Sequence, residues 1–244
     1  MKIIGVIPAR YKSSRFPGKP LELINGVPMI KRVYDNGLKV STFDEIIIAT
    51  DDKRISNKCK ELNMKYIMTP KNCFTGTDRI AYVSKKMKYD LYVNLQGNEP
   101  LIKSETISKF IKGIEDNGIS ELNAFNSMTD CDKQDLININ IPKVVVNCFN
   151  DLLYISRSII PYKRDDNKSQ YYKELGLHAC TKRGLELFSH FKQNNLELSE
   201  KIEYLRFLEM GIPVKMIYLK LNYKNFAVDI PEDIKIVEEI LKNG

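Results

Sequence analysis

The sequence contains no tryptophan and only two histidines, so few positions are open to imidazole chemistry. The five cysteines are widely scattered, odd in number and never in a CxxC pair, which argues against a disulfide framework and a structural zinc site. No apolar run approaches the roughly 18 residues that span a bilayer, and the first residues show a strand pattern without signal-peptide features. We therefore expect reduced thiols, no membrane association and a cytoplasmic location.

The basic character of the chain leaves several kinds of partner open. The net charge is +7 and the isoelectric point is about 9.0, which suits nucleic acid, an anionic membrane surface or a polyanionic small substrate. Many lysines alternate with acidic residues on predicted helix faces, a pattern typical of a solvated surface. Charge alone does not choose among these partners, so the distribution of the cations matters more than their total.

Apolar β-type runs alternate with amphipathic helical segments, which predicts an α/β fold with a mainly parallel sheet. With 43% hydrophobic residues and no linker or repeat, residues 1–244 are expected to form a single domain. Strands are predicted at 2–8, 45–50, 65–68, 90–95, 143–147, 153–158, 176–181 and 214–221. Helices are predicted at 29–39, 52–62, 78–86, 104–116, 182–191, 199–210 and 231–242. Two strand-like runs without an intervening helix predict a β-hairpin insertion within 137–166, which is either a lid or dimer contact or an ordinary hairpin.

The loop after the first predicted strand carries the strongest functional signal. Arg10, Lys12, Arg15 and Lys19 place four cations in ten residues, where the chain average of 38 in 244 predicts fewer than two. In an open α/β sheet, ligands bind beyond the carboxyl ends of the strands, where this loop begins. The loop also holds small and turn-forming residues that let the backbone approach a ligand, and arginines pair well with phosphate oxygens. A triphosphate is the expected partner, and a basic surface loop is the alternative.

Two common nucleotide motifs are absent from the sequence. The GKP segment lacks the Ser or Thr and the upstream glycine of a Walker P-loop, and no GxGxxG fingerprint occurs. No convincing Ser/His/Asp or Cys/His arrangement is present either. The sequence therefore indicates no protein nucleophile, and it carries no recognisable nucleic-acid reading motif.

Ordered motifs over nearly the whole chain resemble the CMP-KDO synthetases, the 3-deoxy-manno-octulosonate (KDO) cytidylyltransferases. The N-terminal segment from Gly5 to Leu21, "GVIPARYKSSRFPGKPL", is similar to the signature of that family. Further similar segments are "TGTDRIA" at 75–81, "VNLQGNEPLI" at 93–102, "YISRSIIPY" at 154–162, "LELSEKIEYLR" at 196–206 and "VDIPEDI" at 228–234.

The resemblance implies a GT-A-like nucleotidyltransferase fold, a homodimer, Mg²⁺ as cofactor and CTP as donor, with CMP passing to an anionic acceptor and pyrophosphate leaving. It assigns catalytic roles to Arg10, Arg15, Lys19 and Asp229. The nucleotide-binding set that it implies is Ala9, Arg10, Ser14, Arg15, Lys19, Thr75, Gln96 and Gly97. The acceptor-binding set is Arg79, Glu99, Arg157, Glu174, His178, Glu203 and Tyr204. The metal ligands are Asp229 and Asn98.

The sequence departs from the family pattern at the metal and acceptor positions. Asn98 replaces an aspartate, so the metal would lose one charged ligand while keeping an amide oxygen. In the stretch "ELGLHAC", Glu174 replaces a histidine, and His178 and Cys180 replace two tyrosines. Tyr204 replaces a glutamine. Because these exchanges cluster at the acceptor side, the acceptor is KDO or another anionic envelope or capsule precursor, such as a related sugar acid, a phosphonate or a phosphorylated small molecule.

Two roles remain open for the acceptor-side histidine, and two for the protein as a whole. His178 is either a general base or a hydrogen-bonded structural residue. Glu174 either receives an ammonium group of the acceptor or points to solvent. The chain is an active cytidylyltransferase in polysaccharide biosynthesis, or it is a non-catalytic CTP-binding descendant that lost its metal site at Asn98.

Overall fold

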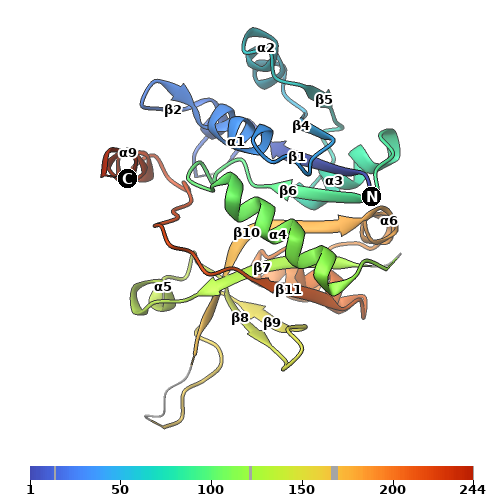
Figure 1. The fold of residues 1–244 in the computed structure, drawn as a ribbon, viewed down its shortest axis with the longest axis vertical. Coiled ribbons are helices and arrows are strands. Elements are labelled where there is room, and N and C mark those ends of the chain that lie inside the picture. Colours follow the sequence, from blue (N-terminus) through green and yellow to red (C-terminus); the bar gives the residue numbers. More distant parts are fainter. Residues whose placement is uncertain (14, 121–122, 166–169, 244) are drawn as a thin grey trace.

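A computed structural model describes residues 1–13, 15–120, 123–165 and 170–243 of the chain (Figure 1). The strands are β1 (Ile3–Ala9), β2 (Leu23–Ile24), β3 (Val27–Pro28), β4 (Glu45–Thr50), β5 (Tyr66–Met68), β6 (Leu91–Leu95), β7 (Ala124–Asp130), β8 (Lys143–Val146), β9 (Leu152–Ser156), β10 (Tyr172–Thr181) and β11 (Val214–Tyr218). The helices are α1 (Met29–Leu38), α2 (Lys53–Glu61), α3 (Gly76–Lys86), α4 (Ser104–Asn117), α5 (Lys133–Ile137), α6 (Lys182–His190), α7 (Asn195–Glu200), α8 (Leu205–Glu209) and α9 (Asp233–Asn243), with a 3₁₀ turn, η1, at Lys19–Leu21.

A large mixed sheet with the order β11-β7-β10-β6-β1-β4-β5 organises the fold. The pairs β11–β7, β6–β1, β1–β4 and β4–β5 are parallel, whereas β10 is antiparallel to β6 and β7. The predicted α/β class with a mainly parallel mixed sheet is therefore confirmed. Because β10 runs against its neighbours, its first residues lie at the edge where β1 and β6 end. The loops after β1 and β6 and the start of β10 thus meet at one edge of the sheet.

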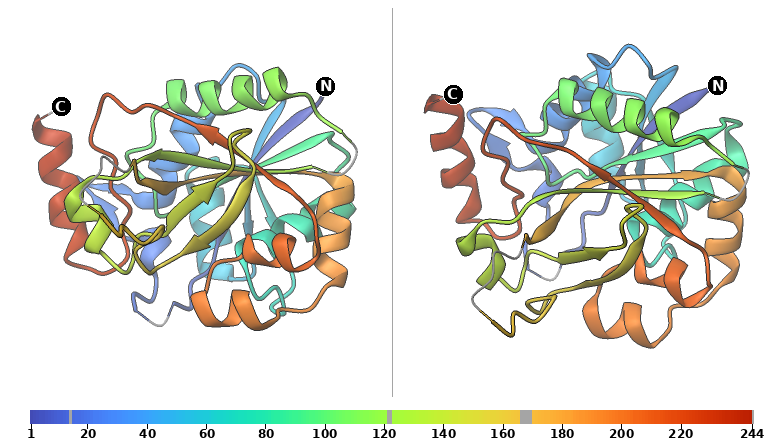
Figure 2. Two further views of the ribbon diagram at one scale, coloured as in Figure 1. Left: turned by 90° about the horizontal axis from the view of Figure 1, so that it is seen from below. Right: turned by 60° about the horizontal axis from the view of Figure 1, so that its bottom comes forward.

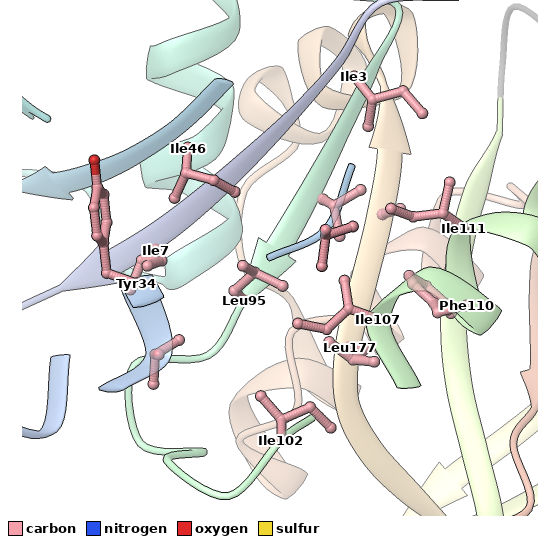
Figure 3. Packing of buried hydrophobic residues seen from close by; sticks show 14 of the residues in the cluster. Ile3, Ile7, Tyr34, Ile46, Leu95, Ile102, Ile107, Phe110, Ile111 and Leu177 are labelled. Atoms are coloured by element: carbon pink, nitrogen blue, oxygen red, sulfur yellow. The ribbon is translucent and has the colours of Figure 1, made fainter. Parts of the chain in front are cut away.

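Two apolar clusters hold the helices against the two faces of the sheet. On one face, Ile107, Phe110 and Ile111 of α4 pack near Leu95 and Leu177 of the sheet (Figure 3). On the other face, α3, α6 and α8 contribute the second cluster, and Figure 2 shows α4 and the α6–α8 segment on opposite sides of the sheet. Every apolar residue named here is buried, so the sheet is a rigid base for the loops at its edge.

The predicted β-hairpin is present and consists of β8 and β9, which pair antiparallel with Lys143 opposite Ser156. It projects from the lower part of the molecule in Figure 1 and joins the large sheet where β8 pairs with β10. No helix in the described part of the chain is long and apolar enough to cross a membrane.

The predicted secondary structure is wrong at one helix, and it lacks the elements β2, β3, α5 and β7. The predicted helix over 199–210 is two short helices, α7 and α8, because Lys201 adopts a left-handed conformation with φ 56°. The strand β7 has no counterpart in the prediction, since its sequence AFNSMTD contains polar residues that resemble a loop. Asn126 and Ser127 are nevertheless fully buried in this strand, where β10 supplies hydrogen-bond partners that the sequence does not reveal.

Candidate active site

Gly18 has a backbone conformation that closes the loop after β1. Gly18 has φ 77° and donates its N–H to the Tyr11 carbonyl at 2.8 Å, which closes the loop. An added Cβ would lie 3.2 Å from the Tyr11 ring, and the positive φ already favours glycine. The Arg54 guanidinium lies 3.2 Å from the Tyr11 ring centroid and covers it. The 3₁₀ turn η1 then begins at Lys19 and directs its side chain toward the C-terminal part of the chain.

This loop forms one wall of a cavity of about 810 Å³ at the edge of the sheet. Gln96 and Gly97, from the loop after β6, form an adjacent part of the wall. The cations that line the cavity are Arg10, Lys12, Arg15, Lys19, Arg79, Arg157 and Lys201. Such a concentration of positive charge favours a polyanion, and the volume suits a nucleotide-sized ligand.

Arg79 is a buried cation on this wall with unused donors. Its side chain is inaccessible to solvent, Nη1 donates to Thr69 Oγ1, and Nη2 lies 3.4 Å from Asp51 Oδ2. Nε and Nη2 have no hydrogen-bond partner. Arg79 was predicted for the acceptor side, and the structure places it in the lining of the larger cavity only.

Lys19, Arg15 and Asp229 form an ion-pair cluster where the two ends of the chain meet. Lys19 Nζ donates to the Val228 carbonyl at 2.8 Å and lies 3.5 Å from Asp229 Oδ1, and Arg15 Nη2 lies 3.4 Å from the same oxygen. Burial lowers the pKa of Lys19, and the charge of Asp229 offsets only part of this effect. Two cations on one carboxylate leave net positive charge for an anionic ligand.

The two predicted metal ligands lie side by side. Val228 links them, because its N–H donates to the Asn98 carbonyl at 2.9 Å and its own carbonyl accepts from Asn98 Nδ2 at 3.3 Å. This bond uses only the Nδ2 of Asn98, and Asn98 and Asp229 line the same cavity. Amide and carboxylate oxygens suit Mg²⁺, which commonly takes one or two carboxylates and completes its shell with phosphates and water. Within the described ranges, no group of three or more His, Cys, Asp or Glu residues could hold a metal alone, so these two residues fit an ion that also binds the nucleotide.

A smaller cavity of about 260 Å³ adjoins the larger one and shares part of its wall. Glu99, Glu174, Tyr204 and Asp229 line the smaller cavity only. The residues that line both are Arg15, Gln96, Asn98, Asn140, Arg157, His178, Lys201 and Glu203. A ligand in the larger cavity would therefore share contact residues with one in the smaller.

Glu174 and His178 are hydrogen-bonded in the wall of the smaller cavity. His178 Nε2 lies 3.0 Å from Glu174 Oε1, and Asn126 Nδ2 donates to the same oxygen at 2.8 Å. Burial alone would raise the pKa of Glu174, but interactions with His178, the hydrogen bond from Asn126 and the charge of Arg157 together outweigh burial and lower the pKa. His178 Nδ1 is enclosed without a partner, so in this arrangement the imidazole supports Glu174. Glu174 does not point to solvent, since only 12% of its side chain is exposed.

Glu99 is the other buried carboxyl group of the smaller cavity. Asn225 Nδ2 donates to its Oε2 at 2.7 Å. Burial raises the pKa of Glu99 to about 7, with the charge of Asp229 adding to the rise and the Asn225 hydrogen bond opposing it. A Cβ on Gly176 would lie 2.7 Å from Glu99 Oε1, so glycine is needed at that position.

Glu99 should make the stability of the protein depend on pH. Its folded pKa of about 7 lies above the ordinary value of 4.5, so its contribution to stability is full below about pH 4.5 and is lost as the pH rises through about 7. Replacement by glutamine should remove up to about 3 kcal/mol of this pH dependence. Urea unfolding at pH 5 and pH 8 measures it, with the exposed Glu105→Gln as control. Parallel pH profiles for wild type and Glu99→Gln would contradict the assignment.

The carboxylate of Glu203 accepts hydrogen bonds from the N-terminus of α3. Its Oε1 accepts from Gly76 N at 2.9 Å and its Oε2 from Thr77 N at 2.8 Å. Thr75 caps the same helix, with Asp78 completing a capping box. Both groups satisfy N–H donors that a helix leaves free at its start. Glu203 thus lines the cavities while it fixes the α3 terminus.

Thr75→Ala should cost stability more than nucleotide binding. Thr75 Oγ1 accepts from Asp78 N at 3.1 Å, and removal of a cap of this type costs about 1 kcal/mol. Thr75 precedes the cavity residue Gly76 but does not itself line either cavity. Chemical denaturation should show the loss, while steady-state kinetics should show a KM for CTP within about threefold of wild type, because no phosphate contact is removed. A tenfold higher KM at unchanged stability would instead make Thr75 a nucleotide ligand.

The segment 138–141, which begins the region where an insertion was predicted, forms a wall of the site. Lys143, which is fully buried, donates to the carbonyls of Asn138 and Ile141 at 3.0 and 2.8 Å. Arg157 Nη1 donates to the two carbonyls between them, those of Ile139 and Asn140, at 3.2 and 3.1 Å. Lys143 and Arg157 thus bind four successive carbonyl groups. These bonds position the segment so that it lines both cavities.

The structure therefore brings most of the predicted residues together, and a few of them lie beside the cavities or outside the described residues. Ala9 and Thr75 are each next to a lining residue, and Ser14 is outside the residues that the structure describes. The predicted binding sets did not include some lining residues, namely Lys12, Ser13, Gly76, Asn94, Asn140 and Lys201, although Lys12 had been counted among the cations of the loop. The cationic loop could have indicated Lys12 and Ser13, and the QGN segment at 96–98 could have indicated Asn94. No sequence signal indicated Lys201, because its position depends on the break between α7 and α8.

Comparison with known proteins agrees with this geometry. The family profile described as cytidylyltransferase matches residues 4–220. The 3-deoxy-manno-octulosonate cytidylyltransferase of Desulfosudis oleivorans is 40% identical, over 99% of this chain and 98% of that protein. The enzyme of the same name from Parabacteroides distasonis is 39% identical, over 100% and 99%. A solved CMP:2-keto-3-deoxy-manno-octonic acid synthetase complexed with CTP superposes with a TM-score of 0.91 at 35% identity, over 100% of this chain and 99% of that one.

Sequence, fold and site geometry thus lead to one assignment. The chain belongs to the CMP-KDO synthetase family of cytidylyltransferases, and it is a CTP-dependent nucleotidyltransferase.

Proposed function

We propose that this enzyme transfers CMP from CTP to KDO and releases pyrophosphate, as a step in polysaccharide biosynthesis. The pair of adjoining cavities supports this proposal most directly. The larger is rich in cations that suit a triphosphate, and the smaller shares a wall with it and contains both cations and carboxyl groups. KDO carries a carboxylate and several hydroxyl groups, so it suits a small cavity of mixed charge. The names of the full-length relatives point to the same acceptor.

The residues of the larger cavity perform the transfer by positioning and charge neutralisation. A hydroxyl oxygen of the acceptor attacks the α-phosphorus in line, the new P–O bond forms, and the bond to the pyrophosphate oxygen breaks. Arg10, Arg15 and Lys19 bind the phosphates and stabilise the negative charge that collects on the leaving group. No covalent intermediate with the protein is required.

We further propose that Asp229 and Asn98 hold Mg²⁺ together with the phosphates of CTP. The ion would supply additional neutralisation of phosphate charge. The role of Asp229 before CTP arrives is to pair with Lys19 and Arg15, which keeps these cations at the edge of the cavity.

Release of pyrophosphate on mixing enzyme, CTP, Mg²⁺ and KDO tests the proposal. We expect kcat/KM for KDO near the usual enzyme range of about 10⁴ M⁻¹s⁻¹ or above, and little release with ATP in place of CTP. A rise in melting temperature with CTP but no release with KDO or with a panel of anionic sugars and phosphorylated compounds would instead support a non-catalytic CTP-binding protein.

We also propose that the hairpin region mediates a homodimer. The apolar side chains that it exposes are Ile137, Ile139, Phe149, Leu153, Ile159 and Tyr162, with exposures of 47% to 87%. Large apolar side chains exposed in this number often belong to a protein interface. The paired variant Phe149→Glu with Leu153→Glu should sediment as a monomer, whereas Met68→Glu on the distant strand β5 should not change the sedimentation coefficient. A monomeric wild type would refute the dimer.

A further inference from the structure

The bulge in β10 creates an arrangement that a regular strand cannot make. Residues four apart in an extended strand are separated by about 13 Å. His178 and Glu174 are four apart, yet His178 Nε2 and Glu174 Oε1 lie 3.0 Å from each other. The pairing of β10 with β7 shifts register between these two residues, and the backbone at Gly176 has φ 20°.

Buried polar groups of β7 hold this bulge in place. Ser127 Oγ lies 2.5 and 2.8 Å from the carbonyls of Leu175 and Leu177 and accepts from the Leu177 N–H at 3.2 Å. Asn126 Oδ1 accepts from the Ser127 N–H at 2.7 Å, which orients its Nδ2 toward Glu174. The Glu174 carboxylate is therefore positioned before any ligand arrives.

One oxygen of this carboxylate remains available to a ligand. Both hydrogen bonds, from His178 and from Asn126, reach Oε1. Oε2 bonds no described residue and is not among the enclosed polar atoms, and Glu174 lines the smaller cavity. An ionised carboxylate only accepts hydrogen bonds and repels anions, so the group that meets Oε2 must be a donor. Arg157 and Lys201 line the same cavity and suit the carboxylate of the acceptor instead.

We propose that Glu174, oriented by His178 and Asn126, is a specificity-determining residue whose Oε2 accepts a hydrogen bond from a hydroxyl or ammonium group of the acceptor. This inference rests on the proposed transfer of CMP to a sugar acid. It excludes acceptors that present a second anionic group at this point, such as phosphorylated compounds. Glu174 lines the smaller cavity and not the larger one, so it selects a substituent of the acceptor and leaves the CTP site unaffected.

Steady-state kinetics of Glu174→Gln and of the surface control Glu22→Gln test this role, with KDO and an analogue in which an ammonium replaces one hydroxyl group. If Glu174 accepts from a hydroxyl group, the variant should raise the KM for KDO at least about tenfold, because it loses a hydrogen bond to a charged acceptor. If Glu174 accepts from an ammonium group, the wild type should prefer the amino analogue by at least about tenfold, and Glu174→Gln should lose that preference. In both cases the KM for CTP and the stabilisation by CTP should stay within about twofold of wild type.

Unchanged KM values for both acceptors would overturn the inference, and so would an equal rise in the KM for CTP. Should Glu174→Gln melt more than about 5 °C below wild type, Glu174→Asp is the second variant, since it keeps the charge but withdraws it from the cavity. Glu174→Asp should raise the KM of the preferred acceptor at least about threefold, and an unchanged value would overturn the inference equally. Failure of the wild type to use either acceptor while CTP still stabilises it would instead refute the proposed function.

Discussion

Lys19→Met should reduce kcat/KM for CTP on the order of 10³-fold, since removing one preorganised charge-stabilising donor commonly costs about 10²–10³-fold and Lys19 also neutralises Asp229. Lys19 is only 17% exposed and its ammonium is held by the Val228 carbonyl, so it is fixed before CTP binds. In the variant, Asp229 would keep only Arg15 as an ion-pair partner. The carboxylate of Asp229 would then be less neutralised and would repel the phosphates of CTP. Initial-rate kinetics over a range of CTP concentrations measure the effect.

Lys109→Met is the matched control, because Lys109 is exposed on α4 and lies outside both cavities. It removes the same charge from the protein and should leave kcat/KM within about twofold of wild type. A small effect of Lys19→Met, equal to that of the control, would show that the triphosphate binds elsewhere.

Asp229→Asn should abolish Mg²⁺-dependent turnover, with a loss of at least about 10³-fold, because metal-based charge stabilisation contributes several kcal/mol. Asn98 is already neutral, so the variant would leave no carboxylate at either predicted metal position. Activity as a function of Mg²⁺ concentration measures this effect. Asn98→Asp should have the opposite effect and give half-maximal activity at a lower Mg²⁺ concentration.

Binding of CTP in EDTA separates the metal role of Asp229 from its ion pairs. Lys19 and Arg15 would lose their shared partner in Asp229→Asn, so metal-free CTP should bind as tightly as in wild type or more tightly. Weaker metal-free binding would show that Asp229 acts mainly by holding these two cations in position. A loss of turnover below about tenfold would mean that the phosphates hold the metal without it.

The fold could be predicted where apolar periodicity was strong. The strands β1, β4 and β6 are continuous buried runs, and α4 shows a clear helical apolar face, so each was predicted close to its observed bounds. The strand β7 was missed because its polar residues, which suggest a solvent-exposed loop, are buried and form hydrogen bonds with β10. The α7–α8 break was missed because a left-handed Lys201 leaves no mark on periodicity.

The site shows the same division between local and tertiary information. The cationic loop from Arg10 to Lys19 is contiguous, so its charge and its position after a strand were visible in the sequence. The hydrogen bond between Glu174 and His178 was not visible in the sequence, because it requires a bulge in β10 that is held by β7, from another part of the chain. Glu203 was predicted to contact the acceptor, and only the structure showed both of its oxygens bonded to the start of α3.

The sequence by itself determined the α/β class, the family and the nucleotide loop, because these depend on periodicity and on residues close together along the chain. The tertiary structure alone decided how Asp229 and Asn98 adjoin, which oxygen of Glu174 remains open, and that burial raises the pKa of Glu99 to about 7. Each of these properties depends on desolvation or on hydrogen bonds between residues distant in the chain. Their energies are set by distance and burial, which no local pattern encodes.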